Sequence, residues 1–385
     1  MTTNSRSRAI GLLAGGAAAI VVIGIALALV QPAPSGHPIT PLSPTTSESP
    51  VAVSKPPQTV VPLQVTARVD LGATEANAMS VGAGAVWLAT QSVAPGASGA
   101  LVRIDAATSR QTARLTVGGD PVAVAANGTF VWVANGDGNG SHDVPEANTV
   151  EQFDATTGAL VDRYHVLDPR GLVANATSAL VISETAGQQT PISLLTAGTT
   201  TPVVTLPGTL NAPISSLSPE VAVASCSDQV FVALTDLSPS ASSVTIYAMR
   251  PDGGAVRKVA TIPNDYEASM TCDTTSVFLI GAAGDGDVTV ARVSIADGAL
   301  TNLWEGPYPV SLAFLAGRVW INYADDALNL SLLTSLDPVT GLAAPTRSVL
   351  PPPPSNGDPS LLVPGDSGLW IVASQGNQLL HVAAG

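Results

Sequence analysis

The sequence is poor in charge, and in positive charge above all. Only 11% of its residues are Asp, Glu, Lys or Arg, and 15 basic residues stand against 29 acidic ones. A chain with a formal net charge of −14 repels a phosphate backbone, so we expect no nucleic-acid partner. With 45% hydrophobic residues, the low charge also argues against a disordered chain and against long solvent-exposed helices.

Histidine and cysteine are scarce as well. The four histidines, at positions 37, 142, 165 and 381, show no paired spacing of the kind that zinc ligands have. No other combination of residues forms a catalytic set, so we predict no cofactor, and we expect no enzymatic activity while leaving it open. What the sequence does contain is 35 Gly and 31 Pro, which suits many short strands joined by turns.

The N-terminus carries a long apolar run. Residues 9–30 have no charge, and as a helix they would span about 33 Å, enough to cross a bilayer core. Arg6 and Arg8 precede them, which favours a short cytoplasmic N-terminus over residues 1–8. We therefore predict a transmembrane signal anchor that crosses a bacterial cell membrane once. The rest of the chain is then expected to lie outside the cytoplasm. The alternative is a cleaved signal peptide, because Ala26-Leu27-Ala28 has the form of a cleavage site, and the chain would then be secreted.

Beyond the apolar run the composition changes twice. Residues 31–62 are rich in Pro, Ser and Thr and predict a disordered linker, since such a segment cannot bury a core. Residues 63–385 are predicted to form one folded domain.

One pattern recurs through residues 63–385. A Gly, Asn, Asp or Ser turn is followed by a short apolar run, usually with an aromatic residue near its start. The seven copies are centred on Trp87, Trp132, Val181, Phe231, Phe278, Trp320 and Trp370. Their spacing is that of β-propeller blades with four short strands each, roughly 40–50 residues per blade. The sequence therefore predicts an all-β fold, a seven-bladed β-propeller, with the repeated aromatics in the core between blades.

The two ends of the domain complement each other. The last copy ends after its third strand, at residues 378–382, and an unassigned strand, residues 64–71, precedes the first copy. We predict that the N-terminal strand completes the C-terminal blade and closes the ring, which removes two exposed sheet edges.

Part of the repeat resembles a known family. Val117-Gly118-Gly119-Asp120-Pro121, Val131-Trp132-Val133-Ala134-Asn135 and Asp154-Ala155-Thr156-Thr157-Gly158 resemble YVTN-type β-propeller repeats. The resemblance covers the first two blades well and implies a seven-bladed propeller. It implies little about function, because the fold hosts binding modules, surface proteins and some enzymes.

Three local features are candidate sites. Cys226 and Cys272, the only cysteines, precede the second strands of blades four and five, where they form either a disulfide or two buried free thiols. Asp137, Asn139 and Asp143 place oxygen ligands at alternate positions like the start of a calcium loop, but they read better as part of a long Gly-rich loop. Gly365-Asp366-Ser367-Gly368 looks like the nucleophile motif of trypsin-like proteases, yet it fills a turn of the repeat.

These observations favour a non-catalytic binding or scaffold propeller at the bacterial cell surface. We expect it to be monomeric, attached to the membrane by its N-terminal helix, and to bind a protein or another ligand of the cell envelope. A hydrolase or lyase in the channel mouth is the first alternative, and a ligand-sensing partner in a signalling complex is the second. The long loops at residues 90–99, 135–148 and 236–242 are the candidate contacts.

Overall fold

The computed structural model divides the chain into two compact units, residues 1–54 and 55–385. The described residues all lie in the second unit: 59–62, 64–72, 74–92, 98–136, 146–184, 189–207, 222–236, 243–263, 269–282, 288–306, 309–325, 330–350, 361–373 and 378–383. The expected membrane segment, residues 9–30, lies outside them. Among the described residues, no helix has the length and apolar character needed to cross a membrane.

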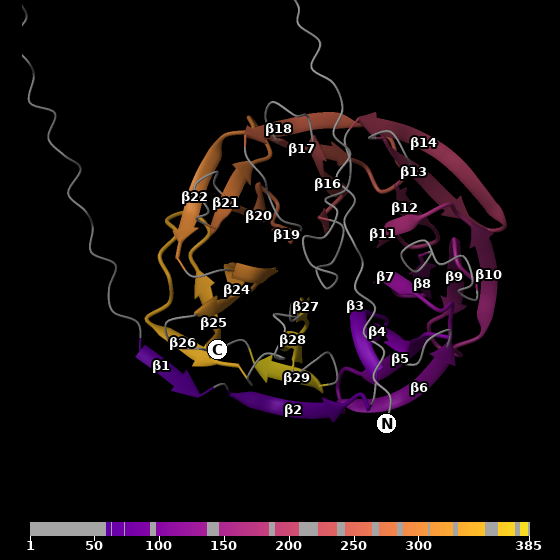
Figure 1. The fold of residues 1–385 in the computed structure, drawn as a ribbon, viewed down its shortest axis with the longest axis horizontal. Helices are drawn as coiled ribbons and strands as arrows, with labels where there is room; N and C mark the ends of the chain where they lie inside the picture. The colour runs from indigo at the N-terminus through magenta and orange to yellow at the C-terminus, as the bar shows by residue number, and fades with distance from the viewer. Residues whose placement is uncertain are drawn as a thin grey trace, which may run out of the picture. The chain divides into compact units, whose positions relative to one another are not determined.

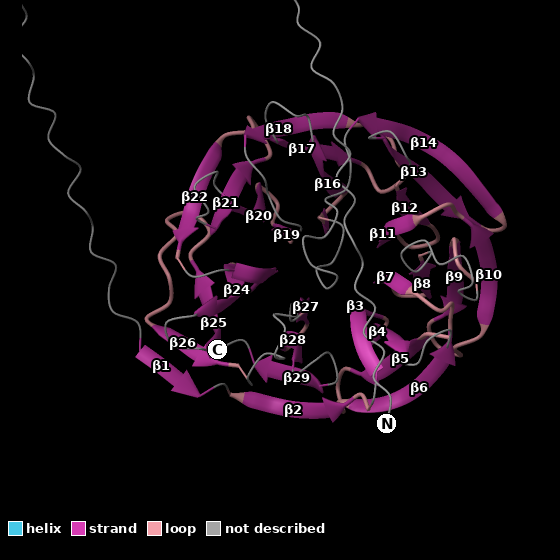
Figure 2. Ribbon diagram, in the orientation of Figure 1, coloured by secondary structure: helices cyan, strands magenta, loops and turns pink. Residues whose placement is uncertain are grey.

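The described chain consists of strands and loops (Figure 2), and its strands form seven sheets. We number the sheets as blades one to seven and name their strands from the innermost outward. Blade one has β3 (Thr74–Gly82), β4 (Ala85–Ser92), β5 (Ala100–Asp105) and β6 (Arg110–Thr116). Blade two has β7 (Pro121–Ala126), β8 (Phe130–Asn135), β9 (Thr149–Asp154) and β10 (Leu160–His165). Blade three has β11 (Pro169–Ala174), β12 (Ala179–Ser183), β13 (Gln189–Thr196) and β14 (Thr199–Pro207).

The remaining blades follow the same order. Blade four has β15 (Val223–Cys226), β16 (Gln229–Asp236), β17 (Ser243–Met249) and β18 (Arg257–Pro263). Blade five has β19 (Met270–Cys272), β20 (Ser276–Ala282), β21 (Val288–Ser294) and β22 (Leu300–Glu305). Blade six has β23 (Pro309–Leu315), β24 (Arg318–Asp325), β25 (Leu330–Leu336) and β26 (Thr346–Val349). Blade seven has β27 (Leu362–Gly365), β28 (Gly368–Ala373), β29 (Gln378–Ala383) and, from the other end of the chain, β2 (Val65–Asp70).

The blades form a closed ring (Figure 1). Each inner strand contacts the next one round, and β27 returns to β3. The outer strands run along the circumference. The predicted closure is confirmed, because β2 pairs antiparallel with β29, from Val65 opposite Val382 to Asp70 opposite Gln378. The seven-bladed propeller expected from the repeat is therefore the observed fold.

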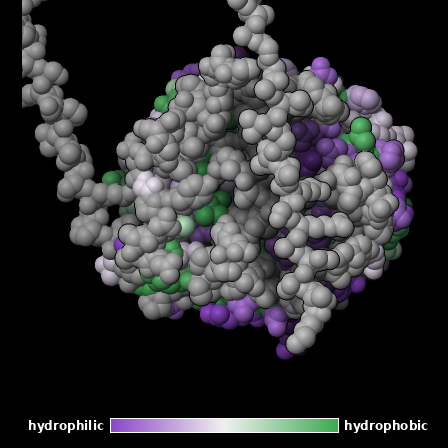
Figure 3. Space-filling model, in the orientation of Figure 1, coloured by the Kyte–Doolittle hydropathy of each residue, from purple (hydrophilic) through white to green (hydrophobic). Residues whose placement is uncertain are grey.

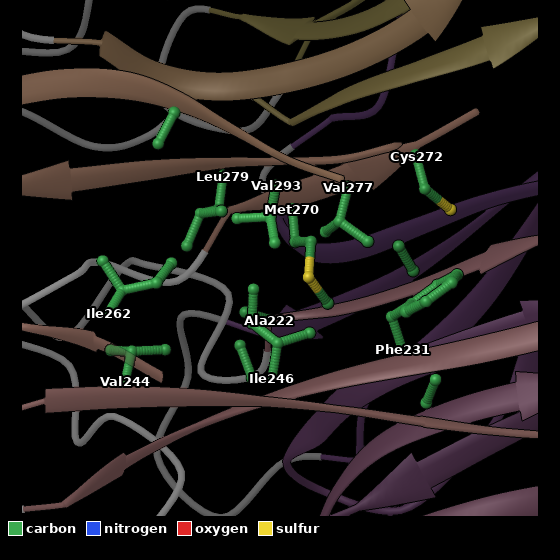
Figure 4. Close-up of a cluster of buried hydrophobic side chains, with 14 residues drawn as sticks. Ala222, Phe231, Val244, Ile246, Ile262, Met270, Cys272, Val277, Leu279 and Val293 are labelled. Atoms are coloured by element: carbon green, nitrogen blue, oxygen red, sulfur yellow. The ribbon is translucent and has the colours of Figure 1, made fainter. Parts of the chain in front are cut away.

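The core lies between neighbouring blades, as the repeat predicted. Trp87, Trp132 and Trp370 are fully buried, whereas Trp320 is partly buried. Figure 4 shows one cluster, in which Phe231 and Ile246 of blade four share a core with Val277 of blade five and its neighbours. Burial from both sides explains why the second strands are continuous apolar runs instead of alternating ones. Where the surface is coloured in Figure 3, hydrophilic residues predominate along much of the rim.

One strand replaces part of the expected linker. Residues 59–62 fall within the predicted disordered segment 31–62, but they form β1 (Thr59–Pro62), which pairs parallel with β26 at the outer edge of blade six. β26 has only four residues, and it pairs with β25 through Leu332 opposite Val349 and Leu333 opposite Ser348. β1 covers an edge that would otherwise be a short, weakly paired strand.

Candidate functional site

The two faces of the ring differ in how strands are joined. In an antiparallel blade, the first and second strands meet on one face and the second and third on the other. On what we call the turn face, the inner hairpins close within a few residues, such as residues 83–84 and 316–317. On the opposite face, which we call the connection face, lie the strand ends that flank the three longest intervals between strands, residues 136–148, 208–222 and 350–361. Variable connections on a rigid scaffold are a common location for binding residues.

Local hydrogen bonds hold the turn face. Asp154 accepts bonds from the backbone nitrogen of Thr157 at 2.7 Å and from its hydroxyl at 2.9 Å. These bonds hold the pKa of Asp154 below its ordinary value of 3.8. Asp105 and Asp337 make equivalent turns. Local hydrogen bonds thus stabilise these turns of the turn face.

The connection face has a polar corner between blades two and three. The residues that we include in the corner are Glu146, Asn148, Leu167, Asp168, Arg170 and Glu184. Leu167 is 63% exposed and directly precedes Asp168. The corner lies where the outer strand of blade two ends and the inner strand of blade three begins, so both blades position it.

Backbone strain is concentrated at this corner. Glu146, Asn148 and Asp168 have φ values of 55°, 58° and 44°. The other described non-glycine residues with positive φ lie in hairpin turns of the turn face: Ala83, Ser109, Ser227, Ala255 and Ala316. Left-handed backbone costs a side chain roughly 1–3 kcal/mol and persists where the surroundings impose it. Asn148 supplies part of that restraint, because its Oδ1 accepts a 2.7 Å bond from the nitrogen of Asp168.

Arg170 is the central charge of the corner. It is the only Lys or Arg on the seven inner strands. Its Nε lies 3.0 Å from Asp168 Oδ1 and 3.5 Å from Glu184 Oε2, and the three side chains are only 20–27% exposed. The two carboxylates hold the guanidinium at the mouth of the ring, which leaves the corner with a net negative charge.

A buried carboxylate is linked to the corner through Arg163. Glu151 on β9 is 2% exposed. Its Oε1 accepts bonds from Arg163 Nη2 at 2.7 Å and Nε at 3.2 Å, and its Oε2 accepts from Asn135 Nδ2 at 3.1 Å. Arg163 Nη1 also lies 3.2 Å from Glu146 Oε2 of the corner, and the hydrogen bond that Arg163 donates to Glu151 raises the pKa of Arg163. The network was not predicted, although a Glu inside a strand covered on both faces was the signal available.

The candidate metal ligands fall outside the residues that the structure describes. Asp137, Asn139 and Asp143 are outside the described residues, as is His142 between them. Within the described parts of the chain, no group of three or more His, Cys, Asp or Glu residues could hold a metal ion.

The two cysteines are joined. Cys226 and Cys272 form a disulfide with a Cα–Cα distance of 5.9 Å, which links the inner hairpins of blades four and five. The sequence alone was compatible with either a disulfide or two buried free thiols. The inner strands on either side, β15 and β19, have four and three residues and are short beside β3, which has nine. The bridge joins the ring where its inner strands contribute least backbone pairing.

The Gly365-Asp366-Ser367-Gly368 motif is a repeat turn, but it also has a partner. Residues 366–367 join β27 to β28, as expected from the repeat. The hydroxyl of Ser367 lies 3.2 Å from Nε2 of His381 on β29, and Nδ1 of His381 lies 2.7 Å from Thr66 on β2. Sequence spacing could not indicate this contact, because it joins three segments from both ends of the domain.

No protein-family model and no curated protein sequence matches the chain, so the YVTN resemblance has no support beyond the repeats themselves. Solved structures do match its fold. A chain from the crystal structure of a mitotic checkpoint complex is 13% identical over 91% of this chain and 99% of its own, with a TM-score of 0.54. Hydrazine synthase from Kuenenia stuttgartiensis is 12% identical over 83% and 98%, with a TM-score of 0.53. BamB from Moraxella catarrhalis is 14% identical over 83% and 99%, with a TM-score of 0.48. At such low identity, these similarities show the fold alone.

Proposed function

We propose that this protein is a binding or scaffold propeller whose connection face takes up a protein or cell-envelope ligand and catalyses no reaction. The observation that carries the proposal is the polar corner. It combines strained backbone, a restrained Arg170 and an exposed Leu167 on the face that has the longest connections. Binding residues are disproportionately found in loops that a rigid scaffold positions.

The rest of the ring supplies rigidity. Closure by β2, the inter-blade cores and the disulfide fix the strand ends from which the connections leave. A surface held in this way loses little conformational entropy when it binds, so more of the contact energy appears as affinity.

We place the ring outside the cytoplasm, attached to the membrane through residues 9–30, or secreted if that segment is removed. The apolar segment supports this placement, and so does a disulfide, since such bonds persist in oxidising compartments. The first described strand, β1, pairs with β26 at the outer edge of blade six.

A matched pair of substitutions tests the proposal. Leu167 on the connection face and Val339 on the turn face are both exposed aliphatic residues, at 63% and 68%. Full-length Leu167→Asp and Val339→Asp proteins would be purified with their envelope partners and the recovered proteins quantified. We expect Leu167→Asp to lose the partner and Val339→Asp to keep it. Failure to recover any specific partner, or loss with Val339→Asp alone, would contradict the proposal.

A further inference from the structure

Blade seven holds a serine in hydrogen-bond contact with a partly buried histidine. Ser367 is exposed in the turn between β27 and β28, and its Oγ lies 3.2 Å from Nε2 of His381 on the third strand. This distance is within the range seen between a nucleophilic hydroxyl and its general base. The site lies on the turn face of blade seven, away from the corner, so it is independent of the proposed function.

Thr66 makes two contacts with His381. Its hydroxyl lies 3.0 Å from the backbone oxygen of His381, to which it can donate, and 2.7 Å from Nδ1 of the ring. Because the hydroxyl has a single proton, donation to the backbone oxygen leaves its oxygen to accept from an Nδ1 that carries the imidazole proton. The contacts therefore accommodate the tautomer that a base needs, in which Nε2 has a lone pair facing Ser367.

The packing around His381 keeps the ring in place. The imidazole stacks on the indole of Trp370 with centroids 4.4 Å apart, and the residue is 9% exposed. Burial lowers the pKa of His381 below its ordinary value of 6.5, so the ring is neutral at pH 7. The charged residues on its own blade are Asp366 in the turn and Arg68 and Asp70 on β2. Blade one, which packs against blade seven, carries Glu75 on β3 and Arg103 and Asp105 on β5.

Glycines fix the geometry of the turn. A side chain at Gly368 would run into the backbone oxygen of Val382, and one at Gly365 would meet the ring of Trp370 at 2.9 Å. Both positions therefore require glycine, and the turn lies close enough to β29 for Ser367 to reach His381.

We propose that Ser367 is a nucleophile, activated by His381, that accepts the acyl group of small activated esters at the turn face. Ser367 Oγ attacks the carbonyl carbon while its proton passes to Nε2. The bond to the leaving alcohol then breaks, and the alkoxide takes the proton from Nε2, which leaves an acyl-serine and a neutral imidazole. Water, deprotonated by the same nitrogen, can release the acyl group by the reverse sequence.

Thr66 sets the expected strength of the activation. A neutral hydroxyl oxygen orients Nδ1–H, but it stabilises an imidazolium less than a carboxylate would. We therefore expect a slow site, in which general-base assistance contributes roughly 100-fold. An active-site-directed fluorophosphonate is a suitable probe, because it reports nucleophilicity without requiring turnover.

The chain contains a matched control. Ser227 is an exposed serine in the equivalent turn of blade four, between β15 and β16. Ser227 is the first residue of its two-residue turn and Ser367 is the second of its own, and the third strand of blade four, residues 243–249, has no histidine.

The test is fluorophosphonate labelling of the full-length protein, with the modified residue identified by mass spectrometry. We expect labelling at Ser367, complete loss in Ser367→Ala and no change in Ser227→Ala. His381→Gln should slow labelling about 100-fold, and Thr66→Val should slow it less. Equal labelling of Ser227 and Ser367, or a wild-type rate in His381→Gln, would overturn the proposal.

A second measurement does not depend on how the variants fold. The labelling rate of the wild-type protein should rise as His381 loses its proton, below pH 6.5, and then level off. A rate that rises only in alkaline solution, as expected for hydroxide-driven reaction of an ordinary serine, would overturn the proposal.

Discussion

The turn face and the connection face are made by the same strands, yet they place different demands on the sequence. On the turn face, acids such as Asp154 and Asp337 cap short turns with local hydrogen bonds. On the connection face, the polar corner depends on contacts between segments, such as Asn148 to Asp168 and Arg163 to Glu146. The comparison suggests that one face maintains the ring while the other is free to carry specificity.

The largest effect should come from deleting residues 64–71, which removes β2. Both faces depend on the closed ring, and the deletion exposes the edge of β29 as well as the core around Leu71 and Leu379. We expect loss of cooperative thermal unfolding. The control is Arg68→Gln, an exposed position on the same strand, which should unfold like the wild type. A deletion variant that unfolds at the wild-type temperature would show that closure does not stabilise the ring.

The next effect should come from replacing both cysteines with serine. The bridge closes a loop with a sequence separation of 46, and the chain-entropy model gives a loss of about 4 kcal/mol in the free energy of unfolding. Denaturant titration of oxidised and double-variant protein measures it. Because the bridge lies in the inner hairpins of blades four and five, binding at the corner should persist. If the partner were lost while the fold remained, the separation of the two faces would be wrong.

Glu151→Ala should have a smaller effect on stability but a direct one on the corner. Removal of the carboxylate takes away the side-chain acceptor of the Gly118 nitrogen and leaves Asn135 Nδ2 with Thr149 Oγ1 as its acceptor. It also frees Arg163 from one of its two partners. Arg163 is 40% exposed and can be solvated, so we expect a loss of about 2 kcal/mol, below that of a fully buried pair. Partner affinity should fall with it. A stability loss without any change in affinity would disconnect the network from binding.

The smallest effect should come from a substitution in a single turn of the turn face. Asp154→Ala removes the bonds from Thr157, so it should lower the unfolding temperature slightly at neutral pH. The pKa of Asp154 is depressed in the folded state, so its contribution is present above pH 3.8 and disappears as pH falls through the folded value. Wild type and variant should therefore converge in acid. A difference that persisted at low pH would mean that the carboxylate is not the cause.

The sequence predicted the parts of the fold that repeat. Seven apolar runs with a shared period gave the blades, and the unmatched strand at each end gave the closure, because a ring leaves no strand unpaired. β1 was not predicted, since Thr59–Pro62 lies in a Pro-rich segment and gains its pairing only from β26. The sequence could not decide between a disulfide and two free thiols, because a sequence position does not give the distance between two Cα atoms.

The candidate sites were harder to predict for the same reason. The buried network joins residues of three strands: Glu151, Arg163 and Asn135. In the sequence, each of them looks like an ordinary polar residue of the repeat. Ser367 and His381 were noted separately, but their contact depends on Thr66 from the opposite end of the domain. The repeat explains positions that recur, whereas these groups use residues that each occur in one blade.

Photo-crosslinking tests the central claim most directly. A photoreactive amino acid would replace Leu167 in one full-length protein and Val339 in another, and both would be illuminated in their own cell envelope. Both sites are exposed to a similar degree, so they differ in face and not in access. The account predicts a discrete crosslinked partner from position 167 and none from position 339. The same partner crosslinked from position 339 and absent from position 167 would contradict it.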